Sequence, residues 1–373
     1  MLFKQFKLVF IVINLLLLAT PVSAATLVKS KAVNFKLETV ATGLGIPWGI
    51  VFLTDNDLLI TEKEGQVKHL NLESGRITTI KGAPRVFAEG QAGLLDVAIN
   101  SDYADTGWIY FTYVKNQSGE GVTVLARAKL REQQLTDWQD LLVTQSASDT
   151  GRHFGSRIAF DKQGYVYFTV GDRGVRPNGQ DLSNHAGTVM RLHTDGRVPE
   201  DNPFVKRKDA LNEIWSYGHR NPQGISYDAK HDRLWIIEHG PRGGDEINLV
   251  SPGKNYGWPV ISYGKEYWGP LAVGEGTHRE GMEQPVKEYT PSIAPASLLL
   301  YSGKAFEPWR GNLFSGALKL RHLNRVVLSE KATAIDEERL LGDLNERIRA
   351  ITEDSKGWIY FSTDSGKIYR IKP

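Results

Sequence analysis

One histidine stands in a glycine-rich segment of the kind that forms active-site loops. His153 lies in "GRHFGSR", residues 151–157, shortly before the strand-like run "DKQGYVYFTV" at 161–170. A neutral histidine near pH 7 can take the proton of a bound hydroxyl group. The residue could equally be a metal ligand or a hydrogen-bonded loop residue, and its immediate neighbours do not decide between these roles.

Several other segments combine glycine or proline with charged or polar residues. They are "EGQAGLLDVA" (89–98), "WSYGHRNPQGISYD" (215–228), "IIEHGPRGGDEINLVSPGKNYGWP" (237–259), "PSIAPAS" (291–297), "GALKLR" (316–321) and "NERIRAI" (345–351). Segments of this composition are typical of functional loops. Because they are far apart in the sequence, a site that contains them needs a fold that gathers loops from the whole chain.

Common catalytic motifs are missing from the sequence. There is no G-x-S-x-G elbow, Walker A loop, H-E-x-x-H pair or G-x-G-x-x-G fingerprint. The nine histidines do not have zinc-like spacings, and the chain has no cysteine. An acyl hydrolase, a nucleotide triphosphatase, a Rossmann-type dehydrogenase and a zinc peptidase are therefore disfavoured.

The elements that must position these loops are short β-rich runs, each introduced by an Asp/Gly turn. Six turn residues mark them: Asn56, Gly107, Gly164, Arg233, Gly311 and Gly357. Irregular repeats of about 40–80 residues that each hold several strands predict a β-propeller. We predict an all-β, six-bladed propeller over residues 25–373, a single catalytic domain whose loop insertions form a site at the channel mouth. A β-sandwich array or a β-helix is the alternative. Residues 32–44 are expected to supply a strand that closes the ring with the C-terminal blade.

Residues 1–24 have the pattern of a secretory signal peptide. Lys4 and Lys7 precede an apolar run at 8–18, and Val22-Ser23-Ala24 ends it with small residues. An uncleaved N-terminal anchor is the alternative. Removal of this segment would lower the net charge from +2 to zero, which gives no support to nucleic-acid binding or membrane attachment of the mature protein. Export without cysteine suits a bacterial periplasm.

Five segments carry a resemblance to a known family. "HFG-R", "GHRNPQG", "EHGPRGGDE", "NYGWP" and "SIAP" occur in this order, and the chain resembles the soluble aldose sugar dehydrogenases from about residue 38 to its C-terminus. These enzymes are relatives of soluble quinoprotein glucose dehydrogenase. The resemblance implies a propeller that carries pyrroloquinoline quinone (PQQ) and calcium. It also implies oxidation of the anomeric hydroxyl of an aldose to an aldonolactone, with electrons passed to an external acceptor.

The resemblance assigns three catalytic roles. His153 is the base that takes the hydroxyl proton while hydride leaves for PQQ. Arg220 stands against the quinone carbonyl and stabilises the negative charge that develops there. Asp245 of "GGDE" is the carboxylate that orients the His153 ring. An arginine that braces a loop and an aspartate that caps a turn are the structural alternatives for Arg220 and Asp245.

The resemblance also implies a set of cofactor contacts. Beside His153 and Arg220 they are Gln91, Asn221, Tyr267, Lys319, Arg347 and Arg349. PQQ has three carboxylates, and arginine binds carboxylates bidentately. Two residues two positions apart on a strand point to the same face, so we expect Arg347 and Arg349 to act together. Solvated surface charges and blade packing are the alternatives.

The calcium ligands are implied by resemblance alone, because carbonyl ligands leave no side-chain pattern. Gly240 and Pro241 would offer carbonyls to a PQQ-linked ion, which would act as a Lewis acid. Glu246 and the Tyr256 carbonyl would hold a second, structural calcium ion. A strand-end salt bridge is the alternative role for Glu246.

Arg152 bears on the choice of sugar. The glucose-dehydrogenase branch has an acidic residue before its catalytic histidine, whereas this chain has Arg152, as in the aldose branch. We therefore expect an enzyme that accepts a broad range of aldoses. We also expect it to be periplasmic and monomeric. Two rival functions are a metal-dependent lactonase, which needs converging carboxylates at the channel, and a non-catalytic propeller that binds sugar or protein.

Overall fold

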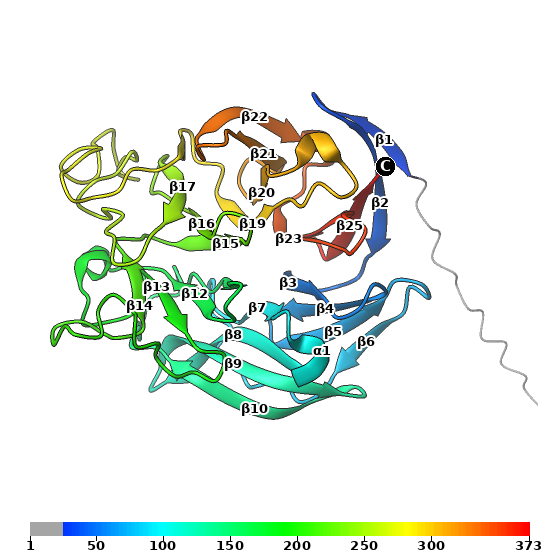
Figure 1. The fold of residues 1–373 in the computed structure, drawn as a ribbon, viewed down its shortest axis with the longest axis horizontal. Coiled ribbons are helices and arrows are strands. Elements are labelled where there is room, and N and C mark those ends of the chain that lie inside the picture. The colour runs from blue at the N-terminus through cyan, green and yellow to red at the C-terminus, as the bar shows by residue number, and fades with distance from the viewer. Residues whose placement is uncertain (1–24) are drawn as a thin grey trace, which may run out of the picture.

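Six antiparallel sheets form a ring in the computed structural model, which describes residues 25–373 (Figure 1). The predicted all-β, six-bladed β-propeller is confirmed. The predicted signal peptide at 1–24 lies outside the described residues. Between residues 25 and 373, no helix is long and apolar enough to cross a membrane.

Each blade is a sheet of at least four strands, ordered from the inner strand outward. The first three blades are β3 (Pro47–Phe52), β4 (Asp57–Glu62), β5 (Gln66–Asn71), β6 (Ile77–Ile80); β7 (Leu94–Ile99), β8 (Trp108–Gln117), β9 (Glu120–Arg131), β10 (Gln134–Val143); and β11 (Ile158–Phe160), β12 (Val166–Val170), β13 (Thr188–Leu192), β14 (Ile214–Tyr217). The fourth and fifth are β15 (Pro222–Asp228), β16 (Arg233–Glu238), β17 (Asp245–Val250), β18 (Lys287–Tyr289); and β19 (Pro295–Leu300), β20 (Leu313–Ala317), β21 (Leu323–Leu328), β22 (Ala334–Leu340).

The sixth blade combines both ends of the described chain. It consists of β23 (Ile348–Glu353), β24 (Ile359–Thr363), β25 (Lys367–Lys372), β2 (Asn34–Ala41) and β1 (Thr26–Lys29). β2 lies beside β25 (Figure 1). The two strands pair antiparallel, with Leu37 opposite Ile371. The predicted closing strand at 32–44 is therefore confirmed. The remaining elements are the short helix α1 (Tyr103–Thr106) and the 3₁₀ turns η1 (Arg176–Gln180), η2 (Glu307–Trp309) and η3 (Gly342–Leu344).

The six turn residues that marked the repeats all lie within two residues of the start of the second strand of a blade. This strand has a neighbour on each side and adjacent blades on both faces, as shown by β12 and β24, in which every residue is buried. A strand buried on both faces must be apolar and β-branched or aromatic along its whole length. The repeated sequence signal comes from this burial.

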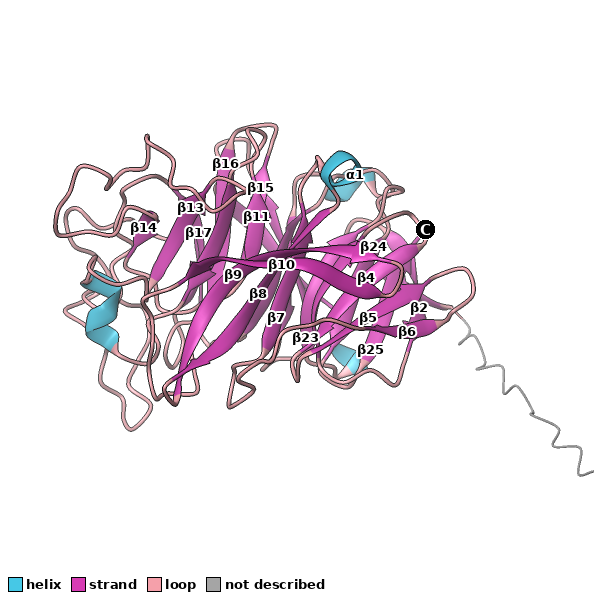
Figure 2. Ribbon diagram, turned by 90° about the horizontal axis from the view of Figure 1, so that it is seen from below, coloured by secondary structure: helices cyan, strands magenta, loops and turns pink. Residues whose placement is uncertain are grey.

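Most predicted site residues lie in or beside two kinds of connection, whereas Tyr256 and Tyr267 lie in the long insertion between β17 and β18. One kind joins the outer strand of a blade to the inner strand of the next, and the other joins the second and third strands of one blade. Because connections in an antiparallel sheet alternate between its ends, both kinds emerge on the same face of the ring. The Asp/Gly turns emerge on the opposite face, and Figure 2 shows the strands running between the two sets of loops.

A buried ion pair lies on the axis of the ring. Arg157 Nη1 is 2.9 Å from Asp96 Oδ1, and the pair borders a cavity of about 170 Å³ that is lined by the inner strands of all six blades. Burial raises the pKa of Asp96 and lowers the pKa of Arg157, because each charge loses water and retains mainly its partner.

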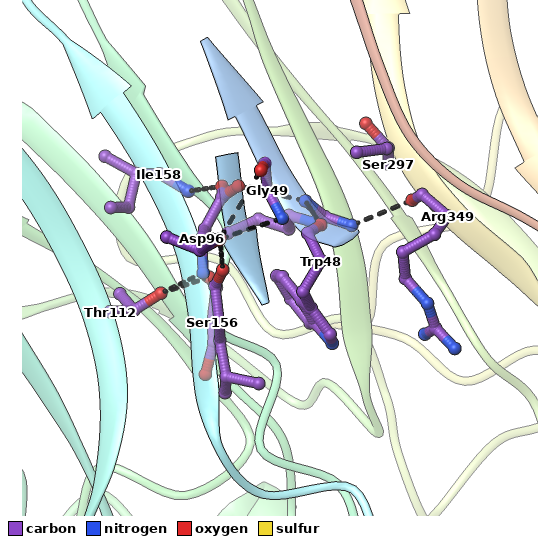
Figure 3. A network of polar contacts seen from close by, with 12 residues as sticks. Trp48, Gly49, Asp96, Thr112, Ser156, Ile158, Ser297 and Arg349 are labelled. Atoms are coloured by element: carbon purple, nitrogen blue, oxygen red, sulfur yellow. Dashed lines mark hydrogen bonds and ion pairs between the residues drawn. The ribbon is translucent and has the colours of Figure 1, made fainter. Parts of the chain in front are cut away.

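The remaining donors of Arg157 reach carbonyls of other blades. They bind the carbonyls of Trp48 in β3 (3.2 Å), Gln223 in β15 (2.8 Å) and Arg349 in β23 (3.0 Å). Asp96 also accepts a bond of 3.0 Å from the Ile158 amide in β11, and Figure 3 shows this network. One guanidinium, with its carboxylate partner, therefore connects the inner strands of five blades.

We predict that Arg157→Met lowers the free energy of unfolding by about 3–5 kcal/mol, because it leaves the Asp96 charge buried without a partner. Urea denaturation followed by tryptophan fluorescence measures this. In the matched control Arg131→Met, the exposed pair with Asp137 is lost, and the free energy should change by less than about 1 kcal/mol. Equal effects of the two substitutions would contradict the role of the axial pair.

Candidate active site

Two cavities open among the loops on this face, with volumes of about 310 and 330 Å³. We call them the His153 cavity and the Arg349 cavity, and Gln91 lines both. The charged residues of the His153 cavity are Arg152, Asp172, Arg176 and Arg220, and those of the Arg349 cavity are Lys63, Arg347, Arg349 and Asp364. Each cavity thus has three cationic side chains and one carboxylate.

His153 is held by Asp172. The ring Nδ1 lies 2.6 Å from Asp172 Oδ1, and both side chains are buried. Asp172 also accepts bonds of 2.7 Å from the Trp258 indole and from the Gly174 amide. An ionised Asp172 requires the ring proton on Nδ1, which leaves the lone pair on Nε2 free to accept a proton.

The structure corrects the expectation that Asp245 orients His153. Asp245 instead accepts hydrogen bonds from the Gly240 amide, the Ser292 hydroxyl and the Ala294 amide, and so fixes the loops around β17. Burial raises the pKa of Asp245 to about 6. Both aspartates follow a glycine. Asp172 is the first acidic residue after the fully buried strand β12, a position that marks it as a loop residue but does not by itself distinguish a turn cap from a partner of His153.

The environment of His153 favours a neutral ring. Burial lowers the pKa of His153, the nearby Arg220 charge lowers it further, and Asp172 partly opposes both effects. Burial raises the pKa of Asp172, but the hydrogen bond and charge of His153, together with the Arg220 charge and the Gly174 amide, outweigh burial, so that the pKa of Asp172 is lowered. At neutral pH the pair therefore consists of a neutral imidazole and a carboxylate.

Gln91 positions the backbone of the histidine loop. Its side-chain oxygen accepts a bond of 2.8 Å from the His153 amide, and its own amide donates to the Gly151 carbonyl over 2.8 Å. The close approach requires glycine at position 90, because a Cβ atom there would overlap the Gly151 carbonyl. The predicted glycines thus serve a loop–loop contact beside both cavities.

Among residues 25–373, two side chains that line these cavities each have a buried donor without a partner. Arg220 Nη1 binds the His239 carbonyl (3.1 Å), but Arg220 Nε is unbonded. The Asn221 side-chain oxygen accepts from the Gly155 amide (3.2 Å), whereas its Nδ2 is unbonded. Buried polar atoms are nearly always hydrogen-bonded in native proteins, so these two donors indicate a ligand in the adjoining cavities.

Arg347 and Arg349 lie on one side of the chain, as expected. Nε of Arg347 and Nε of Arg349 each donate over 2.8 Å to an oxygen of Asp364. Burial raises the pKa of Asp364, but the two arginines outweigh it and lower this pKa. Lys63, in the turn between β4 and β5, is a third cation of the Arg349 cavity that the sequence reasoning missed.

Three predicted residues lie at or beyond the rim. Tyr267 lines the His153 cavity, is 67% exposed and donates to the Pro241 carbonyl over 3.0 Å. Arg152 lines the same cavity, is exposed and packs against Gly174. Lys319 is exposed and lines neither cavity, so its contact with a cofactor stays a prediction.

A third, small cavity of about 20 Å³ adjoins Gly240. Its walls include the two carboxylates Glu238 and Glu246, together with Tyr256. Burial and the neighbouring Glu238 charge raise the pKa of Glu246 to about 8. Two carboxylates in a cavity of this size offer the oxygen ligands that Ca²⁺ prefers.

Comparisons with known proteins show the family to which the chain belongs. Residues 44–370 match the model of the family described as Glucose / Sorbosone dehydrogenase, and the chain belongs to this family. The aldose sugar dehydrogenase YliI of Escherichia coli is 38% identical over 347 residues, which cover 90% of this chain and 92% of the relative.

Two solved structures are similar over nearly the whole ring. The apo-form of the soluble aldose sugar dehydrogenase from Escherichia coli superposes with a TM-score of 0.87 at 35% identity, covering 91% of this chain and 99% of that one. The PQQ-bound form of the aldose sugar dehydrogenase from Streptomyces coelicolor superposes with a TM-score of 0.75 at 26% identity, covering 90% and 96%.

We predict that Asp172→Asn lowers the pKa of His153 further, because the imidazolium loses the anion that stabilises it while burial still opposes its charge. NMR titration of the His153 ring measures the shift. Asp195→Asn, at the exposed pair with Arg197, is the control and should leave this pKa unchanged. An unchanged or raised His153 pKa in Asp172→Asn would contradict the assigned contact.

Proposed function

We propose that this protein is a PQQ- and Ca²⁺-dependent aldose dehydrogenase that oxidises the anomeric hydroxyl group of a sugar to a lactone. The observation that carries the proposal is the hydrogen-bonded pair of the His153 imidazole and the Asp172 carboxylate beside two unbonded buried donors, Arg220 Nε and Asn221 Nδ2. Family membership and the PQQ-bound relative support it. Electrons would pass to an external acceptor.

The residues present fit PQQ. Its three carboxylates match the three cations of the Arg349 cavity, and Asp364 holds Arg347 and Arg349 in place. Trp48 and Phe154 give this cavity aromatic walls suited to a flat ring system. When bound, PQQ supplies the hydride acceptor that no side chain provides.

The proposed chemistry of the side chains follows from their contacts. His153 Nε2 takes the proton of the anomeric hydroxyl, and Asp172 stabilises the resulting imidazolium. Arg220 places a fixed, buried positive charge at the wall of the same cavity, where it stabilises developing negative charge. Gln91, which lines both cavities, fixes the His153 backbone through its bond to the His153 amide.

Calcium is the second proposed cofactor. The Gly240 and Pro241 carbonyls would serve a PQQ-linked ion, and Glu246 with the Tyr256 carbonyl would hold a structural ion in the small cavity. The Glu238 carboxylate, which lines the same cavity, would add oxygen ligands to this second site. Calcium bound there would remove the repulsion between the two glutamates.

Arg152 at the rim supports a broad range of aldoses, and the pattern of residues 1–24 supports a periplasmic location. A lactonase of the carboxylate-rich type has weaker support, since residues 25–373 contain no group of three or more His, Asp and Glu side chains placed to hold a metal ion. A non-catalytic propeller would not require the His153–Asp172 pair.

Reconstitution tests the proposal directly. Purified apoprotein is mixed with PQQ and CaCl₂, and reduction of an artificial electron acceptor is followed with a panel of aldoses. We expect dye reduction with several aldoses, lost when either PQQ or calcium is omitted. Absence of dye reduction with every aldose, despite bound PQQ, would overturn the enzyme assignment.

Two variants separate catalysis from cofactor binding. His153→Ala should lower kcat by about 10²–10⁴-fold, because the base is lost, and should leave the Kd for PQQ nearly unchanged. Arg347→Ala should raise the Kd for PQQ with a smaller effect on kcat at saturation. Stopped-flow kinetics and PQQ titration measure both. Near-normal turnover of His153→Ala would contradict the role of His153 as the base. An unchanged Kd for PQQ in Arg347→Ala would contradict the role of Arg347 in PQQ binding.

A further inference from the structure

Arg173 is a completely buried arginine directly after Asp172. It has no carboxylate ion-pair partner in the described part of the chain and binds backbone carbonyls instead. Nη1 donates to the Arg152 carbonyl over 2.5 Å, and Nη2 donates to the carbonyls of Thr150 (3.0 Å) and Gly121 (3.3 Å). Arginines are rarely buried without an acidic partner, so this arrangement calls for a reason beyond filling space.

Through these three carbonyls the guanidinium group is held against the histidine loop. Two of them belong to Thr150 and Arg152, just before His153, and the guanidinium carbon lies 3.4 Å from the ring centroid of Phe154, just after it. The Thr150 hydroxyl also donates to the Arg173 carbonyl. Arg173 therefore contacts the chain on both sides of His153 without touching the imidazole.

The loop needs such support because its backbone is unfavourable. His153 has φ +59° and Ser156 has φ +79°, both in the left-handed region that side chains other than glycine rarely adopt. Such conformations persist where surrounding contacts enforce them. Gln91 binds the His153 amide, and Arg173 binds the carbonyl that precedes this amide.

We propose that Arg173 is a positioning residue for His153, which fixes the backbone of residues 150–154 so that the imidazole meets both Asp172 and the cavity. Two consecutive residues then hold His153: Asp172 binds the imidazole ring of His153, and Arg173 binds the backbone of the histidine loop. The inference rests on the proposed function, since it assigns Arg173 a part in presenting the catalytic base. A buried hydrophobic residue could fill the space but could not bind three carbonyls.

The test compares Arg173→Ala with Arg325→Ala. Arg325 is also buried, binds Asn312 and Glu338 in the fifth blade and is far from the loop in sequence. Both substitutions remove a buried arginine and should lower the thermal midpoint. With PQQ and calcium bound, we expect the kcat of Arg173→Ala alone to fall about 10–100-fold, the loss typical of a small displacement of a catalytic group. KM for the sugar and Kd for PQQ should change less than about threefold.

Two readouts distinguish positioning from general destabilisation. Added guanidinium should restore part of the lost kcat in Arg173→Ala. In the apoprotein, the proton shared by His153 Nδ1 and Asp172 should give a downfield ¹H NMR signal that shifts or broadens in Arg173→Ala and not in Arg325→Ala. This second readout requires no dehydrogenase activity, so that it tests the inference even if the proposed function fails.

An unchanged kcat and NMR signal in folded Arg173→Ala would overturn the proposal, as would equal kinetic losses in Arg325→Ala. If Arg173→Ala does not fold, Arg173→Lys decides the question. Lysine keeps the charge but cannot reach all three carbonyls with one planar group, so the proposal expects the same loss of kcat and the same change in the NMR signal. Parental values in Arg173→Lys would overturn it.

Discussion

The buried pair of Arg157 and Asp96 is the interaction on which the arrangement of the blades depends. A propeller has no continuous sheet across its axis, so the inner strands must be joined by side chains. Here one planar guanidinium binds carbonyls of Trp48, Gln223 and Arg349, and each of these residues also lines the Arg349 cavity. The contact that joins the blades therefore also sets the wall of the proposed cofactor site.

Above this wall, the candidate site is built from loops that constrain one another. Gln91 from one blade connection binds the His153 amide in the next, and Asp172 from a third connection binds the imidazole. Trp258 lies in the long connection between β17 and β18, and its indole N–H donates a hydrogen bond to the second carboxylate oxygen of Asp172. Hydrogen bonds between loops restrict their motion, so that these loops can hold catalytic groups in the fixed geometry that catalysis requires.

Fold and site were predictable to different degrees. The ring could be predicted because the doubly buried second strands leave a repeated apolar signal. His153, Arg220, Arg347 and Arg349 could be expected in one region because their segments resemble a known family, and they line the two cavities. Asp172 was missed because a carboxylate after a strand looks the same whether it caps a turn or orients a ring. The partners of Arg157 and Arg173 are carbonyls, which every residue has, so no pattern of side chains could reveal them.

The sheet shared by β2 and β25 has a consequence for how the molecule assembles. Contacts such as Leu37 with Ile371 join the beginning and end of the described chain. The entropic cost of closing so long a loop grows only with the logarithm of its length, so each doubling of the loop costs about 0.6 kcal/mol. Folding rates, in contrast, decrease as contacts become more distant in sequence. The β2–β25 contact, which joins the two ends of the described chain, is therefore expected to limit how fast the ring folds.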